Sequence, residues 1–241
     1  MRIDVYMICR NEATLLPFWI RHYGPIARRI FAYDGGSDDG TVELLKACAN
    51  VRVAPCDFDG LDDYRMADLF SHAYRLHSRG MADWAICVDA DEFVYHPHLL
   101  AKLDLLKAQG AALVQCEGWN MLSETFPTGT GQIYEEIKRG VMDDYFSKPI
   151  VFDPEINVEF LPGRHAATFP PFKAAANTGI KLLHYRWLGE DYGRARSSRN
   201  ADRITPANRV AGHGVHNDPE WTGVHSPEWF KKQMPYAKDA V

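Results

Sequence analysis

Two carboxylates one residue apart stand directly after an apolar run. The run at 84–88 (Trp-Ala-Ile-Cys-Val) is followed by Asp89, Ala90, Asp91 and Glu92. Such a run is typical of a buried strand in a parallel sheet, and α/β proteins bind ligands at the carboxyl ends of such strands. Buried carboxylates this close need a cation, and a divalent ion with open positions would present the phosphates of a nucleotide diphosphate. A solvated acidic turn is the alternative that the spacing leaves open.

The segments around this motif alternate between strand and helix patterns. Strands are predicted at 3–9, 29–33, 51–54, 84–88 and 111–116, and helices near 15–23, 41–49, 62–78 and 97–109. This alternation predicts an α/β fold with a mostly parallel sheet flanked by helices. We expect the carboxyl ends of the strands to meet along one edge, where they form a crevice.

The chain becomes irregular after Gly118, with many Gly, Pro and aromatic residues. The patterns there predict short strands at 150–152 and 180–184 and helices at 187–198 and 227–238. We therefore expect a single domain over 1–241, with a nucleotide-binding half at 1–117 and an irregular substrate-binding half at 118–241.

Composition excludes several classes of protein. The 241 residues carry a formal net charge of −5, and no stretch concentrates Lys and Arg as nucleic-acid binding would require. The first residues show no secretory apolar region, and no apolar run approaches the ~20 residues of a membrane span. The five cysteines form no CxxC pair, so we expect reduced thiols in a cytoplasmic protein.

Two further strand ends are polar in a way that packing does not require. The first predicted strand ends in Arg10, Asn11 and Glu12, and the second runs into the acidic, glycine-containing segment 34–41. Each is explained alone by a helix start or a capped turn. Because three such ends share one sheet edge, we expect them to line the same crevice.

The segments 7–12, 16–22 and 33–41 together resemble the family 2 type of glycosyltransferases with the GT-A (Rossmann-like) fold. The resemblance is strongest to the subgroup whose first helix carries a Trp-x-x-His pattern, here Trp19 and His22. It covers the first half of the chain and extends more loosely to 184–186. It implies that 1–117 binds a nucleotide sugar and that 118–241 binds the acceptor.

The resemblance also implies roles for individual residues. Asp89 and Asp91 correspond to the DxD motif, with Asp91 on Mn²⁺ or Mg²⁺ and Asp89 on the ribose or the metal. His184 matches a further metal ligand of many GT-A enzymes, although a core histidine is the plain alternative. Nucleotide-binding roles are expected for the other matching polar residues and for one later lysine: Arg10, Asn11, Glu12, Asp34 and Lys148.

The reaction requires groups that the motifs do not supply. A departing nucleoside diphosphate is stabilised by cations, for which Lys148, Arg164 and Arg186 are candidates. Inverting transfer needs a general base, and the candidates are Glu117, which ends the predicted strand at 111–116, and His165, in a glycine-containing turn. Two further acids in the second half also qualify: Glu155 and Glu159.

We therefore predict a metal-dependent, inverting glycosyltransferase that moves a sugar from a UDP-linked donor to a hydroxyl of a glycan or lipid-linked acceptor. By family analogy the acceptor is a bacterial surface glycan or its precursor. Peripheral contact with a membrane is compatible with the sequence. One alternative is a haloacid-dehalogenase-like phosphatase with Asp89 as nucleophile and Asp91 as acid/base, opposed by the late position of the motif and by Phe93. The other is a GT-A fold that binds nucleotide or glycan without catalysis.

Overall fold

A parallel sheet forms the centre of the computed structural model, which describes residues 1–56, 60–171, 174–218 and 220–241. Within these residues the strand order is β12-β6-β9-β4-β1-β2-β3. Its central strands are parallel: β1 (Ile3–Cys9) pairs with β4 (Trp84–Asp89) and β2 (Arg29–Asp34), and β2 pairs with β3 (Val51–Pro55). All seven residues of β1 are buried, as a central strand covered on both faces requires.

The edge of this sheet beyond β4 is built from short strands. These are β6 (Leu113–Val114), β9 (Val151–Phe152) and β12 (Ala174–Ala175). β9 runs antiparallel to both β4 and β6, while β12 is parallel to β6. The predicted strand at 150–152 is therefore present, but the one predicted at 111–116 is only two residues long.

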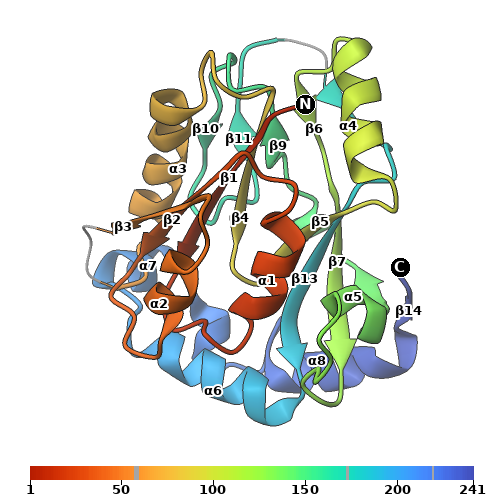
Figure 1. Ribbon diagram of the computed structural model, residues 1–241. Coiled ribbons are helices and arrows are strands. Elements are labelled where there is room, and N and C mark those ends of the chain that lie inside the picture. The colour runs from red at the N-terminus through yellow and green to blue at the C-terminus, as the bar shows by residue number, and fades with distance from the viewer. Residues whose placement is uncertain (57–59, 172–173, 219) are drawn as a thin grey trace.

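Helices from the first half cover the sheet (Figure 1). They are α1 (Leu16–Tyr23), α2 (Thr41–Lys46), α3 (Asp63–His77) and α4 (Leu99–Ala108). Each starts where its sequence favours a helix: Pro17 stands in the first turn of α1, and the Asp62 side chain accepts from the amides of Tyr64 and Arg65 at the start of α3. The predicted architecture, a mainly parallel sheet flanked by helices, is confirmed.

A second sheet of order β14-β8-β7-β13-β5 adjoins the first. Its strands are β5 (Glu92–Tyr95), β7 (Glu117–Ser123), β8 (Arg139–Met142), β13 (Lys181–Leu188) and β14 (Lys238–Asp239). β13 is parallel to β7 and antiparallel to β5. Because β4 of the first sheet continues through Ala90 and Asp91 into β5 of the second, the acidic motif stands where the two sheets meet.

The remaining elements surround this junction. In Figure 1, α6 (Glu190–Ala201) lies along the bottom of the molecule, below the arrowhead of β13. The other short elements are α5 (Ile133–Glu136), α7 (Pro206–Ala211), α8 (Pro227–Gln233), the antiparallel pair β10 (Glu159–Phe160) and β11 (Ala167–Thr168), and 3-10 turns at 144–146, 215–217 and 234–236. No helix of the described residues is long and apolar enough to cross a bilayer.

Three predicted elements differ from the structure for identifiable reasons. Glu117 begins β7 instead of ending a strand, so the argument that placed its carboxylate at the carboxyl edge was wrong. The late strand continues to Leu188, because Trp187 is buried and stacks on Phe230 at 5.3 Å, and α6 starts only at Glu190. The last helix ends at Gln233 and is followed by a 3-10 turn that contains Pro235.

Candidate functional site

A cavity of about 460 Å³ lies at the junction of the two sheets. Its walls come from the carboxyl ends of β1 and β4, the middle of β13, one face of α6 and residues of the segments 212–217 and 221–225. The volume falls in the range of pockets that hold small molecules. The position is the one expected for a ligand site in an α/β sheet.

Most of the predicted site residues meet in this cavity. Those that line it are Arg10, Glu12, Asp89, Asp91, Lys148, Arg164, His165, His184 and Arg186. Asn11, Asp34 and Glu117 are not among its lining residues. The polar strand ends therefore converge, as predicted, but not every residue in them faces the cavity.

Asn11 and Asp34 instead tie two loops together. The Asn11 side chain donates to Asp38 Oδ1 (2.8 Å) and accepts from the Asp38 amide (2.9 Å), while its backbone holds φ 54°. Asp34 Oδ2 accepts from the amides of Gly36 and Ser37, both at 3.0 Å. These contacts satisfy loop backbone groups, as an Asx turn does, so a direct contact of either residue with nucleotide stays a prediction.

Side chains of helix α1 hold the backbone of the acidic turn and of β5 by hydrogen bonds. Trp19 Nε1 donates to the carbonyl of Asp89 (3.2 Å), and the Tyr23 hydroxyl donates to the carbonyl of Glu92 (3.1 Å). His22 Nε2 donates to the carbonyl of Val94 at 3.0 Å. The Trp-x-x-His pattern thus orients the turn through its backbone, and its side chains do not line the cavity.

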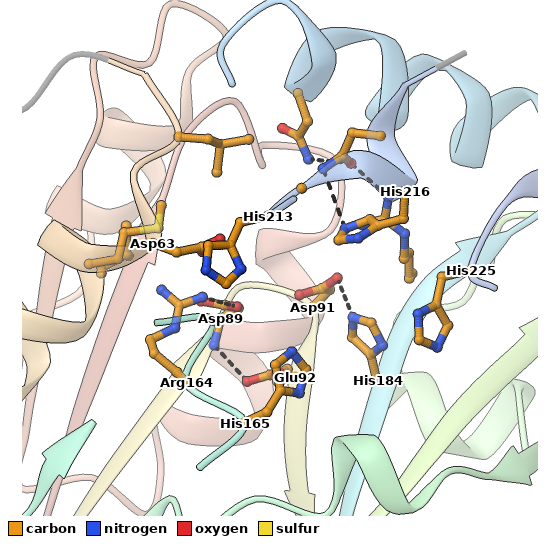
Figure 2. A pocket seen from close by; sticks show the side chains of 18 of the residues that line it. Asp63, Asp89, Asp91, Glu92, Arg164, His165, His184, His213, His216 and His225 are labelled. Carbon is orange, nitrogen blue, oxygen red and sulfur yellow. Dashed lines mark hydrogen bonds and ion pairs between the residues drawn. The ribbon is translucent and has the colours of Figure 1, made fainter. Parts of the chain in front are cut away.

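Two carboxylates of the turn are paired with cations from the second half. Arg164 Nη2 lies 2.7 Å from Asp89 Oδ2, and Lys148 Nζ lies 2.5 Å from Glu92 Oε1. Figure 2 shows Arg164 beside Asp89. Burial raises the pKa of Asp89 although Arg164 opposes it. For Glu92 burial also raises the pKa, but Lys148 and His184 together outweigh it and lower that pKa.

Arg196 of α6 bridges two further carboxylates. Its guanidinium contacts Asp91 Oδ2 through Nη1 and Glu12 Oε1 through Nη2 at 2.9 Å. His184 Nε2 also lies 3.1 Å from Asp91 Oδ2, as drawn in Figure 2. Burial raises the pKa of Asp91, but Arg196 and His184 outweigh it and hold that pKa well below its usual range.

A divalent ion would need free ligand atoms on the predicted metal ligands Asp89, Asp91 and His184. His184 Nδ1 donates to Asn120 Oδ1 (2.9 Å), a contact often made by metal-binding histidines. However, Asp91 Oδ2 is already contacted by Arg196, and Asp89 faces Arg164. Within the described ranges, no three His, Cys, Asp or Glu side chains are arranged to hold a metal ion. The arrangement therefore does not fit Mn²⁺ or Mg²⁺.

The unpaired polar atoms of the cavity are donors. Three guanidinium nitrogens lack a hydrogen-bond partner among the described residues: Arg164 Nη1, Arg196 Nε and Arg203 Nε. Arg186 is 8% exposed, and its hydrogen-bond partners among the described residues are neutral: Asn217 Oδ1 (2.7 Å) and Ser197 Oγ (3.3 Å). Burial, together with repulsion from Arg196, lowers the pKa of Arg186 to about 10. Buried donors and cations without partners favour an anionic ligand.

A histidine–aspartate pair lines the other side of the cavity. His225 Nε2 lies 2.9 Å from Asp143 Oδ2, which also accepts from Asn120 Nδ2 at 2.8 Å. Because hydrogen bonding outweighs burial and lowers the pKa of Asp143, the carboxylate is an acceptor and His225 Nε2 carries the proton. His225 also has φ 66°, a backbone strain that is often found at functional sites.

His165, one of the two leading candidates for the base, has no carboxylate partner among the described residues. Its Nδ1 donates to the carbonyl of Tyr145 (2.8 Å). Burial, followed by the charge of Lys148, lowers its pKa to about 2. A group with so low a pKa accepts a proton poorly near neutral pH.

Sequence reasoning missed three of these residues: Asp143, Arg196 and His225. Arg196 belongs to the most basic segment of the chain, 194–203, which was a weak signal. Asp143 and His225 lie in irregular segments 82 residues apart, and nothing in the local sequence connects them.

Comparisons with known proteins identify no family for this chain. No family model matches the chain, and no curated protein matches it. Among solved structures, S. aureus TarS aligns with 98% of this chain at 10% identity and a TM-score of 0.45, covering 44% of the TarS chain. TarS 1–349 in complex with UDP-GlcNAc aligns at 10% identity and a TM-score of 0.46, covering 73% of that chain, and its UDP complex at 11% and 0.44, covering 72%. This chain therefore spans less than half of the TarS chain, and the low similarity does not indicate what it does.

Proposed function

We propose that the protein transfers a sugar from a nucleotide-linked donor, most simply a UDP-sugar, to a hydroxyl of a glycan or lipid-linked acceptor. The observation that carries the proposal is the cavity at the carboxyl ends of β1 and β4, in which Arg186 and Arg196 present buried cationic groups. A diphosphate matches these donors in charge and in hydrogen-bonding geometry. Residues 1–117 would hold the nucleoside and 118–241 the acceptor, with Arg186 and Arg196 of the second half on the diphosphate.

The reaction follows from these groups. The acceptor oxygen attacks the anomeric carbon and forms the new glycosidic bond. The bond from that carbon to the diphosphate breaks, and its electron pair stays on the departing nucleoside diphosphate. Attack on the face opposite the leaving group inverts the anomeric centre. Arg186, which has no carboxylate partner among the described residues, would stabilise the charge that develops on the leaving oxygen.

The acceptor proton would pass to His225. Its Nε2–H is held by Asp143, so Nδ1 carries the free lone pair, and the aspartate stabilises the imidazolium that forms, as in other Asp–His pairs. We expect His225→Gln to retain nucleotide binding and to lose about 10²–10⁴-fold in rate. The measurement is hydrolysis of the UDP-sugar that binds best, with water as acceptor. A smaller loss of rate in His225→Gln than in His165→Gln would indicate that His165 is the general base.

The donor class is tested by thermal stability in the presence of UDP, GDP, CDP, ADP and UDP-GlcNAc. A ligand at 100 times its dissociation constant stabilises the folded state by about 2.7 kcal/mol, which raises Tm by roughly 5–11 °C for a chain of this size. We expect one base to be preferred. If no nucleotide raises Tm, the transferase proposal is wrong.

The geometry of the site does not support the phosphatase alternative. Its nucleophile would be Asp89, but one oxygen of that carboxylate is bonded to Arg164. Stabilisation by magnesium with phosphate analogues, independent of the base, would nevertheless favour it. Nucleotide binding without any hydrolysis or transfer would favour the non-catalytic binding fold.

A further inference from the structure

We propose that guanidinium groups of this chain, in place of a divalent metal, neutralise the diphosphate of the donor. The inference rests on the proposed function, because it takes a nucleoside diphosphate as the ligand. It departs from the Mn²⁺ or Mg²⁺ that the DxD resemblance implies. Its basis is how the carboxylates and cations of the cavity are distributed.

The carboxylates that would bind a metal are engaged by cations from the chain. Arg196 contacts both Asp91 and Glu12, and Arg164 lies 2.7 Å from Asp89. A divalent ion at Asp91 Oδ2 would have to displace the Arg196 contact or stand beside a buried guanidinium. Both are unfavourable, because like charges repel strongly in a buried site. The side chain of Asp91 is only 4% exposed, so solvent screens little of that repulsion.

The cavity has cations left over after these pairs form. Arg10, Arg186 and Arg203 all line it, and none has an ion-pair partner in the described part of the chain. Arg186 is 8% exposed and is held in place by Asn217 and Ser197. A buried cation without a counter-ion is costly, and a bound diphosphate would supply the missing charge.

Arg186 and Arg196 are both buried and both line the cavity. Arg196 is 8% exposed, and its Nε has no partner among the described residues although both of its terminal nitrogens are bonded. Arg186 and Arg196 are close enough for Arg196 to lower the pKa of Arg186. Two neighbouring guanidinium groups, each fixed by other side chains, offer planar donor sets that suit phosphate oxygens.

A second like-charged pair, Arg10 and Arg203, also lines the cavity. A Cβ on Gly35 would lie 3.3 Å from Arg203 Nη2 and 3.6 Å from Arg10 Cβ, so both arginines flank this glycine. Burial, followed by repulsion from Arg10, lowers the pKa of Arg203. This pair adds to the positive charge of the cavity lining, which the diphosphate of the ligand would offset.

The test is calorimetric titration of UDP and of uridine into the full chain, once in EDTA and once in MnCl₂. We expect UDP to bind with the same affinity in both. Arg186→Met should weaken UDP about 10- to 100-fold, the effect of losing a charged hydrogen bond, and should leave uridine unaffected. Arg194→Met is the matched control, since Arg194 lies on α6 outside the cavity and bonds Glu190 and Glu228. Arg186→Lys, which keeps the charge, should lose less than Arg186→Met.

Each outcome decides one of the two proposals. UDP binding that disappears in EDTA and returns with MnCl₂ would overturn the guanidinium site and leave the transferase in place. Equal UDP affinity in Arg186→Met and the parent would also overturn it. If no nucleoside diphosphate binds in either buffer, the transferase fails, and titration of inorganic pyrophosphate in EDTA then decides the anion site. If pyrophosphate binds and Arg186→Met weakens that binding, the anion site is supported. If pyrophosphate does not bind, the anion-site proposal is wrong.

Discussion

Replacing Arg196 by methionine is expected to lower the free energy of unfolding by about 3–5 kcal/mol. The side chain is 8% exposed and bonds two carboxylates, Asp91 and Glu12, which are 3% and 8% exposed. Methionine preserves much of the volume but leaves both carboxylates buried with one cation fewer. Urea denaturation of the two proteins at neutral pH measures the difference through a shift in the midpoint.

Further variants distinguish unpaired charge from altered packing as the cause of the lower free energy of unfolding. Adding Glu12→Gln and Asp91→Asn to Arg196→Met removes the unpaired charges, so most of the stability should return. Arg194→Met, on the same helix but with solvent-exposed partners, should leave the unfolding transition nearly unchanged. A triple variant as unstable as Arg196→Met would show that the loss comes from packing and not from charge.

The alternation of strands and helices in the first half could be read from the sequence because hydrophobic periodicity there reflects local burial. The missed strand β5 follows the acidic motif without a turn signal, since Ala90 and Asp91 alone separate it from β4. β7 contains Gly118 and Asn120, which are unusual in strands. Both strands are specified by pairing with β13, a contact that is distant in sequence.

The site could be predicted only where its residues follow strands. Asp89 and Asp91 stand at such an end, and they do line the cavity. Arg196 lies in a helix whose sequence is polar on every side, so periodicity gives no sign of its buried face. The structural cause is Gly193: a Cβ there would lie 2.4 Å from Trp187, so the glycine lets α6 approach β13 and brings Arg196 over Asp91. That close approach depends on tertiary packing.

The motif that carried the family resemblance acts through position and not through contact with ligand. Trp19, His22 and Tyr23 bond the backbone of the turn and of β5. Their side chains are all buried, and His22 is 8% exposed. Trp-x-x-His therefore indicates a helix that braces the acidic turn, which explains how its residues can matter without lining the cavity.

His22 should make the stability of the protein depend on pH in a defined window. Burial lowers its pKa to about 4 from a usual value of 6.5, against the hydrogen bond to the Val94 carbonyl. Above pH 6.5 the ring is neutral in both the folded and the unfolded chain and contributes nothing. As pH falls from 6.5 to about 4, the unfolded chain takes up a proton that the folded chain does not. Folding is therefore weakened by about 3 kcal/mol over this window.

His22→Gln isolates this contribution, since a glutamine amide can still donate to Val94 but does not titrate. We expect its free energy of unfolding to fall by about 3 kcal/mol less than that of the parent between pH 6.5 and 4, measured by urea denaturation at both pH values. His165 and His216, whose pKa values burial also lowers to about 2, keep both proteins acid-sensitive, so the comparison is between variants. His72→Gln, at an exposed position on α3, should follow the parent. Parallel pH profiles for His22→Gln and the parent would mean that His22 is protonated in the folded chain. In that case Nδ1 would carry a proton and could not accept a hydrogen bond from the Tyr134 hydroxyl.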